Sequence, residues 1–329
     1  MKVDIVGGSG FIGTRLCVLL KSKRMSFKIV DIVKSNRFPK ETILGDVRSV
    51  KELKSSISEN AILINLAAEH RDDVFPLKLY DDVNVQGAKN LCLIARRKNI
   101  NKIIFTSSVA VYGFAPLGTN ELGAIAPFND YGRTKWEAEH VYRQWQAEDP
   151  QNRTLVIVRP TVVFGERNRG NVFNLLKQIA SGKFVMVGDG LNRKSMAYVE
   201  NVAAFIKYSM SFKSGIHIYN YIDKPDFSMN DLVSRVNKLL GRSSVIRIRI
   251  PYMLGLAIGK LFDLVAKVLG RKFPISSIRV KKFCVNSVYE SAISQTDFVP
   301  PVKLMDAIEK TVRYEFIESH DNEQVFYSE

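Results

Sequence analysis

The sequence predicts an α/β fold, in which a doubly wound parallel sheet is followed by a smaller C-terminal α/β domain. Over the first half of the chain, short apolar runs alternate with amphipathic stretches, which is typical of a parallel sheet covered by helices on both faces. The 329 residues are enough for two domains, and helices outnumber strands after Pro160. We therefore expect a first domain over 1–165, to which 196–220 returns, and a second over 166–329.

The expected elements follow in chain order from the spacing of the apolar residues. Short apolar runs indicate strands, and apolar residues three or four positions apart indicate helices. The expected strands are Val3–Val6, Phe27–Val30, a short one just before Gly45, Ala61–Leu66, Lys102–Thr106 and Thr154–Val158. The expected helices are Phe11–Lys23, Leu79–Arg97, Tyr131–Ala147 and Val172–Ser181.

The composition excludes several classes of protein. Apolar residues make up 46% and charged residues 25% of the chain, which excludes a disordered protein. Cys17, Cys92 and Cys284 lie far apart, which excludes a small disulfide scaffold and fits a reducing compartment. Neither they nor the four scattered histidines have metal-ligand spacing, so no metal is expected. We expect no signal peptide and no membrane span.

The charge is unusual, because 48 basic residues face 33 acidic ones and the net charge is +15. Such an excess indicates an anionic partner: a nucleic acid, an anionic membrane or a phosphorylated substrate. Arg242–Lys282 carries ten basic residues and one acidic residue. Within it, Tyr252–Leu269 is apolar except for three charged residues, and suits either a membrane interface or a core or dimer helix. No nucleic-acid-binding motif accompanies the charge, so no nucleic-acid partner is expected.

A glycine motif follows the first expected strand and opens the first helix. Glycines at 7, 10 and 13 permit a tight turn and a close approach to a diphosphate, to which the helix N-terminus offers its amides. Asp31 ends the next strand, where a carboxylate binds ribose hydroxyls and repels a 2′-phosphate, so NAD is favoured over NADP. The alternative is a glycine-rich turn without a ligand. Asp46 is expected either to contact adenine or to cap the next helix.

A second motif places Tyr131 and Lys135 four residues apart, on one face of a helix. The ammonium group is expected to lower the pKa of the tyrosine. Ser108 follows a strand and can hydrogen-bond both the substrate and Tyr131. Together the three residues predict a proton relay that oxidises an alcohol. Alone, the pair would be an ordinary surface pair; after the glycine motif, it indicates a catalytic site.

These motifs resemble the extended short-chain dehydrogenase/reductase family, the NAD-dependent nucleotide-sugar epimerases and dehydratases. The resemblance also includes Asn65–Ala68, Asn84 and Arg159–Pro160. It implies a Rossmann domain with a smaller substrate-binding domain, and Ser108, Tyr131 and Lys135 as catalytic residues. The NAD contacts that it implies are Gly7, Gly10, Phe11, Ile12, Gly13, Asp31, Asp46, Val47, Leu66, Ala67, Ala68, Asn84, Tyr131, Lys135 and Pro160.

Two neutral residues indicate which reaction within this family the chain catalyses. Val109 and Ala110 stand where the family's dehydratases carry an acidic pair, which disfavours elimination of water. Asp31 argues against an NADPH-dependent reductase, whereas an epimerase recycles its NAD. A soluble UDP-hexose 4-epimerase and a membrane-associated NAD-dependent alcohol dehydrogenase remain alternatives.

Three segments narrow the resemblance further: Ala68–Val74, Gly165–Asn171 and Ser276–Cys284 are similar to bacterial 4-epimerases of N-acetylglucosaminyl-diphosphoundecaprenol. That similarity implies a lipid-linked sugar substrate, a part in O-antigen polysaccharide synthesis, and a peripheral location on the cytoplasmic face of the inner membrane. A homodimer is possible.

The substrate's diphosphate has three candidate ligands, Arg167, Arg169 and Lys194, each of which could instead be solvated loop charge. Ser108 is the expected contact to the sugar. No catalytic role is expected for His70, Asp72 or Asp73.

Overall fold

A seven-stranded parallel sheet forms the larger part of the computed structural model, which describes residues 2–71, 74–246, 248–270, 276–320 and 323–327. Its strand order is β10-β6-β5-β4-β1-β2-β3, and every pair is parallel. The strands are β1 (Val3–Val6), β2 (Phe27–Asp31), β3 (Thr42–Leu44), β4 (Ile62–Asn65), β5 (Lys102–Thr106), β6 (Thr154–Pro160) and β10 (Gly215–Tyr221). The predicted α/β class with a parallel sheet is confirmed.

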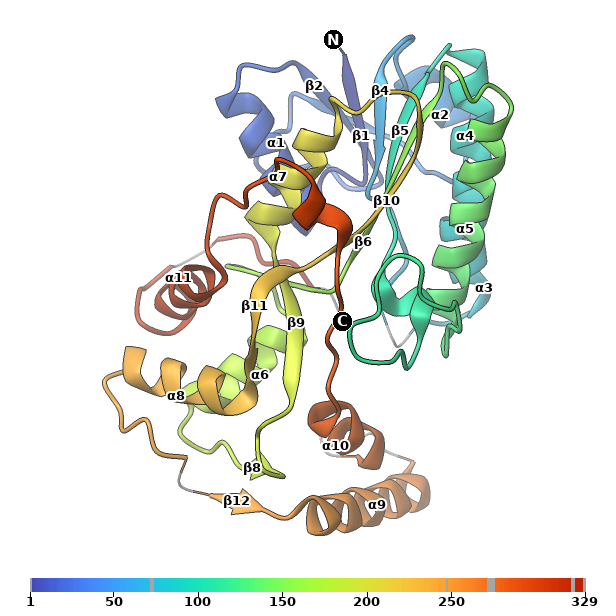
Figure 1. Cartoon of the computed structure of the whole chain (residues 1–329). Helices are drawn as coiled ribbons and strands as arrows, with labels where there is room; N and C mark the ends of the chain where they lie inside the picture. Colours follow the sequence, from blue (N-terminus) through green and yellow to red (C-terminus); the bar gives the residue numbers. More distant parts are fainter. Residues whose placement is uncertain (1, 72–73, 247, 271–275, 321–322, 328–329) are drawn as a thin grey trace.

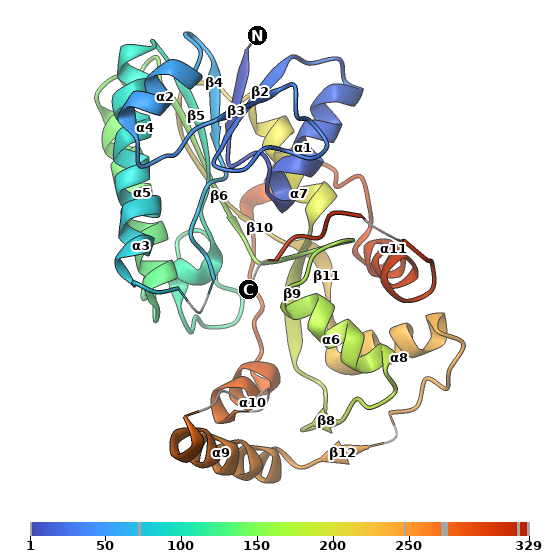
Figure 2. The same ribbon diagram turned by 180° about the vertical axis from the view of Figure 1, so that it is seen from behind.

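Helices cover both faces of this sheet (Figures 1 and 2). Successive strand residues point to opposite faces, so Ile5 packs with Leu16 and Phe205, whereas Val6 packs with Leu91 and Trp145. On one face lie α1 (Phe11–Ser22) and α7 (Val199–Ser209), and on the other α2 (Val50–Ser56), α3 (Lys78–Tyr80), α4 (Gly87–Arg97) and α5 (Asp130–Ala147).

The helix expected over Leu79–Arg97 is not uniform. Between α3 and α4 the backbone is π-helical over Asp81–Gln86, a local widening that occurs mostly as single turns inside α-helices. It includes the buried Asn84, whose side chain bonds to Thr134 and to the backbone of Glu69.

The second part is built around a small three-stranded sheet, in the order β11-β9-β7. Its core is formed with α6, α8 and α11, and includes Leu176, Leu232 and Ile308. The elements are β7 (Val162–Phe164), α6 (Asn171–Ala180), β8 (Met186–Val187), β9 (Arg193–Tyr198), β11 (Asp223–Ser228), α8 (Met229–Leu239), β12 (Arg249–Ile250) and α11 (Leu304–Phe316). Between β9 and β11 the chain leaves this part to form α7 and β10, so Met196 itself lies in the small sheet.

Two helices, α9 (Tyr252–Leu269) and α10 (Ser277–Cys284), lie at the end of the molecule farthest from the large sheet (Figure 1). Glycines let α9 approach its neighbours closely. A Cβ at Gly255 would lie 2.5 Å from a methyl group of Val187 on β8, and one at Gly259 would lie 2.8 Å from Ser277 on α10. Among the described residues, no helix combines the length and the apolar character that a membrane crossing requires.

Candidate active site

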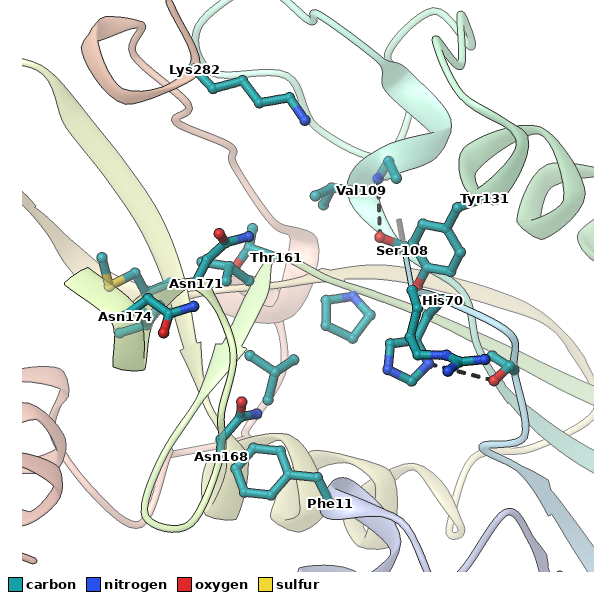
Figure 3. A pocket seen from close by; sticks show the side chains of 18 of the residues that line it. Phe11, His70, Ser108, Val109, Tyr131, Thr161, Asn168, Asn171, Asn174 and Lys282 are labelled. Atoms are coloured by element: carbon teal, nitrogen blue, oxygen red, sulfur yellow. Dashed lines mark hydrogen bonds between the residues drawn. The ribbon is translucent and has the colours of Figure 1, made fainter. Parts of the chain in front are cut away.

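A cavity of about 2500 Å³ runs between the two parts, from the glycine motif to α9. In Figure 3, Ser108, Tyr131 and His70 face Asn171 and Asn174 across this space. Most of the residues predicted from the sequence line it: Gly7, Gly10, Phe11, Ile12, Gly13, Asp31, Asp46, Val47, Leu66, Ala67, Ala68, Ser108, Tyr131, Lys135, Pro160 and Lys194.

The glycine motif forms a cradle that fits a dinucleotide. Gly7 has a φ of +76°, and a Cβ there would lie 2.4 Å from the backbone nitrogen of Ala67. At Gly13 a Cβ would lie 2.6 Å from the Cα of Gly8, so a side chain at either position would displace the backbone. No side chain caps the N-terminus of α1, which leaves its first amides to a ligand.

Asp31 stands at the rim of this cradle. One of its carboxylate oxygens accepts a hydrogen bond of 2.9 Å from the amide of Ser9, and the other accepts one of 3.1 Å from the amide of Val33. Burial raises the pKa of the carboxyl group, and these amide hydrogen bonds act in the opposite direction. The carboxylate is thus fixed at the end of β2, where it can accept hydrogen bonds from ribose hydroxyls.

Asp46 has a role different from helix capping. Ser49 caps α2, because its side chain accepts the amide hydrogen of Glu52. Asp46 instead accepts hydrogen bonds from the backbone and the guanidinium of Arg48, which lower the pKa of its carboxyl group. Both residues line the cavity, so of the two roles expected for Asp46 the capping one is wrong.

The catalytic candidates converge from two elements. Ser108 follows β5 and begins the 3-10 helix η2 (Val109–Tyr112), where its Oγ accepts a hydrogen bond of 3.1 Å from the amide of Ala110. Tyr131 lies in the first turn of α5, which Asn129 caps. A Cβ at Gly132 would lie 2.4 Å from the carbonyl oxygen of Ala110, so this glycine lets the two segments meet.

Lys135 is held on the wall of the site. Its Nζ donates a 2.7 Å hydrogen bond to the carbonyl oxygen of Thr106 and lies 4.7 Å from the centre of the Phe105 ring. Burial lowers the pKa of this ammonium to about 7.

The expected effect of Lys135 on Tyr131 is not found among the protein groups. Burial raises the pKa of Tyr131 to about 12, and it is the hydrogen bond with Ser108 that lowers it. In the protein without NAD, burial favours the neutral form of both side chains.

Asn84, in the π-helical turn, and His70, in the loop after β4, lie next to the site. Asn84 does not line the cavity; it accepts a 2.9 Å hydrogen bond from the amide of Glu69 and donates a 3.0 Å bond to Thr134, so it ties a wall loop to α5. His70 does line the cavity, and burial lowers the pKa of its ring. Asp72 and Asp73 lie outside the described residues.

The structure brings only one of the three predicted diphosphate ligands to the cavity. Arg167 forms a 3.2 Å ion pair with Glu323, and Arg169 forms one of 2.9 Å with Glu315 on α11. Neither arginine lines the cavity. Lys194 does line it, but its Nζ donates to the carbonyl oxygens of Lys282 and Val285, and burial lowers its pKa to about 8.

Other cations take this place on the cavity wall, namely Lys177, Lys183, Arg279 and Lys282. Lys282 extends from α10 over the cavity (Figure 3), and its Nζ lies 5.4 Å from the centre of the Phe128 ring. The sequence signal for Arg279 and Lys282 is the basic stretch Arg242–Lys282. Pattern alone could not separate the basic residues that face the cavity from those that face solvent.

The family is decided by a comparison with protein-family models. The model described as the NAD dependent epimerase/dehydratase family matches residues 3–221. The chain belongs to this family. NAD is therefore its cofactor, in agreement with the glycine cradle and Asp31.

Individual relatives extend over the whole chain. It is 45% identical to an N-acetyl-alpha-D-glucosaminyl-diphospho-ditrans,octacis-undecaprenol 4-epimerase of Escherichia coli O157:H7. The alignment spans 332 residues and covers 100% of this chain and 99% of that protein. It is 27% identical to a UDP-glucose 4-epimerase of Vibrio cholerae over 82% of this chain and 85% of that one. The crystal structure of UDP-glucuronic acid 4-epimerase from Bacillus cereus in complex with NAD has the same fold, with a TM-score of 0.72, 20% identity and coverage of 95% and 96%.

Proposed function

We propose that the chain is an NAD-dependent 4-epimerase that interconverts N-acetylglucosamine and N-acetylgalactosamine on undecaprenyl diphosphate. The 45% identity to the Escherichia coli O157:H7 enzyme over the full length of both chains supports this substrate. The structural observation that carries the proposal is the extent of the cavity, which joins Tyr131 to the apolar helix α9. A single substrate can therefore reach both the catalytic site and the side of α9 that carries Gly255 and Ile258.

At C4 of the sugar, the side chains of the protein transfer one proton. The phenolate of Tyr131 takes the proton of the C4 hydroxyl, and the Ser108 hydroxyl donates a hydrogen bond to the C4 oxygen. NAD, held by the glycine cradle and Asp31, would supply reversible hydride transfer at C4. Tyr131 then gives its proton back to the C4 oxygen, so no net oxidation occurs.

Elimination of water has no support in this site. Val109 and Ala110 line the cavity directly after Ser108, and neither side chain can accept or donate a proton. A 4,6-dehydratase needs an acid and a base at these positions to remove a hydroxyl group from the neighbouring carbon. These two residues therefore favour an epimerase over a dehydratase.

The diphosphate is assigned to the basic wall of the cavity. Lys177 and Lys183 belong to α6 and the loop that follows it, and Arg279 and Lys282 belong to α10. Positive groups on both sides of the space can neutralise the two phosphates of the substrate. Lys194 remains a candidate, although its ammonium already has two carbonyl partners.

The outer face of α9 suits an anionic membrane. Met253, Leu254, Leu261 and Leu264 are exposed by 71%, 50%, 60% and 61%, whereas the small residues Gly255 and Gly259 face the protein. A surface helix of a water-soluble protein normally has the opposite arrangement, with its large apolar side chains inward. Lys260 and Lys267 are exposed on the same helix and can contact anionic headgroups. We infer peripheral binding to the cytoplasmic face of the inner membrane, as part of O-antigen synthesis.

The test is a pair of assays on the purified protein. It is given N-acetylglucosaminyl-diphosphoundecaprenol in anionic vesicles and, separately, UDP-N-acetylglucosamine, and the two C4 epimers are separated. We expect efficient conversion of the lipid-linked sugar. Conversion of the UDP-sugar alone would instead establish a soluble UDP-sugar 4-epimerase, the activity in the name of the Vibrio cholerae relative.

A further inference from the structure

The cavity is larger than its catalytic end requires. Sites for small molecules commonly enclose about 300–1,000 Å³, and this cavity encloses about 2500 Å³. Beyond the glycine cradle and Tyr131 it passes the basic wall and continues to α9. This remaining length needs an occupant of its own.

The far end of the cavity is apolar. Six side chains from four elements and one loop surround it, and we call this end the apolar chamber: Phe184, Val187, Ile250, Ile258, Val280 and Phe283. Phe184 and Phe283 are in contact, with ring centres 6.2 Å apart, and so form one continuous part of its wall. None of the six side chains carries a hydrogen-bonding group, so a polar ligand gains no hydrogen bond from them.

The chamber reaches the surface beside the exposed face of α9. Val185, which is 37% exposed, and the exposed Arg279 both line the cavity. Ile258 contributes to the chamber from the inner side of α9, while Leu254 and Leu261, four positions before it and three after it, are exposed. An apolar chain leaving the chamber would thus continue along the apolar face of α9.

We propose that the apolar chamber binds the first isoprene units of a polyprenyl diphosphate sugar, and that the rest of the chain leaves along α9. This inference rests on the proposed function. With the sugar at Tyr131 and the diphosphate at the basic wall, the next atoms of such a substrate are branched hydrocarbon, whose burial is favourable. A UDP-sugar would place a ribose and a uracil ring in that direction, and their polar groups find no partners among the six side chains.

The experiment uses soluble substrates, so that membrane binding does not enter the result. The intact NAD-loaded protein is assayed in detergent-free buffer with two N-acetylglucosaminyl diphosphate esters. One carries a methyl group and the other a chain of two isoprene units. The measured quantity is the ratio of kcat/KM for the isoprenyl ester to kcat/KM for the methyl ester. We expect a ratio on the order of tenfold or more in the wild-type protein, mainly through a lower KM.

Two variants on different elements test the chamber, Ile258→Ser on α9 and Phe184→Ser on the loop before β8. Each should bring the ratio close to one, because each places a hydroxyl group in the chamber. The matched control is Ala257→Ser, which puts the same side chain on the exposed position next to Ile258 and should keep the ratio. Bound NAD and the thermal unfolding temperature identify any variant that fails to fold.

Three outcomes are distinct. A wild-type ratio near one, with both esters epimerised, would show that the apolar chamber does not bind isoprene units, and would leave the proposed function intact. A high ratio that both chamber variants retain also contradicts binding in the chamber. Activity on UDP-N-acetylglucosamine with none on either ester overturns the proposed function, and the chamber with it.

Discussion

At the scale of single residues, the site contains one side chain whose hydroxyl must change protonation state for the reaction to proceed. Tyr131 is half-buried in the cavity wall, and desolvation favours its neutral form. Replacing it with phenylalanine removes the acid–base group and keeps the ring, so packing is preserved. We expect Tyr131→Phe to lower kcat by about 10²–10⁴-fold, while tightly bound NAD and the unfolding temperature stay unchanged. A variant that retains a near-normal rate would show that another group is the base.

Ser108 should set the pH dependence of the same step. Its hydrogen bond lowers the pKa of Tyr131, and the base is active only when deprotonated. Ser108→Ala removes this bond, so the pKa of Tyr131 rises and the acidic limb of the kcat/KM profile should move to higher pH. The maximal rate should also fall, because the C4 oxygen loses a donor. An acidic limb at the same pH as in the wild type would show that Ser108 does not lower the pKa of Tyr131.

The residue scale also shows where sequence alone could not succeed. Ser108, Tyr131 and Lys135 were predicted from local spacing, and the structure brings all three to one cavity. Arg167 and Arg169 form ion pairs with Glu323 and Glu315, which lie about 150 residues further along the chain. No local pattern reports such a distant pairing.

At the scale of elements, α9 was recognised as an apolar helix, but its orientation was not. Its pattern allows a core helix, a dimer helix or a helix that lies in a membrane interface. The deciding features are Gly255 and Gly259, which face β8 and α10 and leave the large side chains outside. Which side of an apolar helix faces the protein depends on its neighbours, and β8 is too short for a sequence pattern to reveal.

The exposed face of α9 leads to a prediction on membrane binding. The triple variant Met253→Ser, Leu261→Ser, Leu264→Ser should lose most co-sedimentation with anionic vesicles, because it removes the apolar contact. For the wild-type protein, high salt should weaken binding because it screens the basic residues, each of which contributes about 1 kcal/mol near an anionic membrane surface. The apolar contact should remain, so binding should not be lost.

The matched control for this prediction is Leu122→Ser. Leu122 is 93% exposed and precedes α5, in the part of the molecule that carries the large sheet. This variant should sediment with vesicles as the wild-type protein does. If the wild-type protein ignores vesicles and the triple variant turns a dimer into a monomer, the face is instead a homodimer interface.

At the scale of the whole molecule, the buried carboxyl group of Asp223 lies where the chain passes from the large sheet to the second part. Asp223 begins β11 directly after the large sheet ends, and accepts hydrogen bonds of 2.6 Å from the amide of Tyr198 and 2.9 Å from the side chain of Asn201. Burial nevertheless raises the pKa of Asp223 from 3.8 to about 6.

This shift predicts a pH dependence of stability. Between about pH 4 and pH 6 the unfolded chain has lost the proton of Asp223 and the native protein retains it. The free energy of unfolding that Asp223 contributes should therefore fall as pH rises through this window, by up to about 3 kcal/mol for two pKa units.

The measurement is urea unfolding at pH 4 and pH 6.5, for the wild type and for Asp223→Asn. The wild type should lose more stability across the window than this variant, which has no proton to release. Asp297→Asn, at an exposed position, is the control and should follow the wild type. Equal slopes for all three proteins would contradict the raised pKa.

The route of the chain between the two parts has a consequence for synthesis and folding. Strand β10 completes the large sheet beside β6, yet it follows three strands and a helix of the second part. Until Ser209 has left the ribosome α1 lacks its partner α7, and until Tyr221 has left it the edge of β6 is unpaired. An exposed strand edge of this kind invites aggregation. The first 165 residues, expressed alone, should therefore be insoluble, whereas a chain ending after β10 would at least contain every strand of the large sheet.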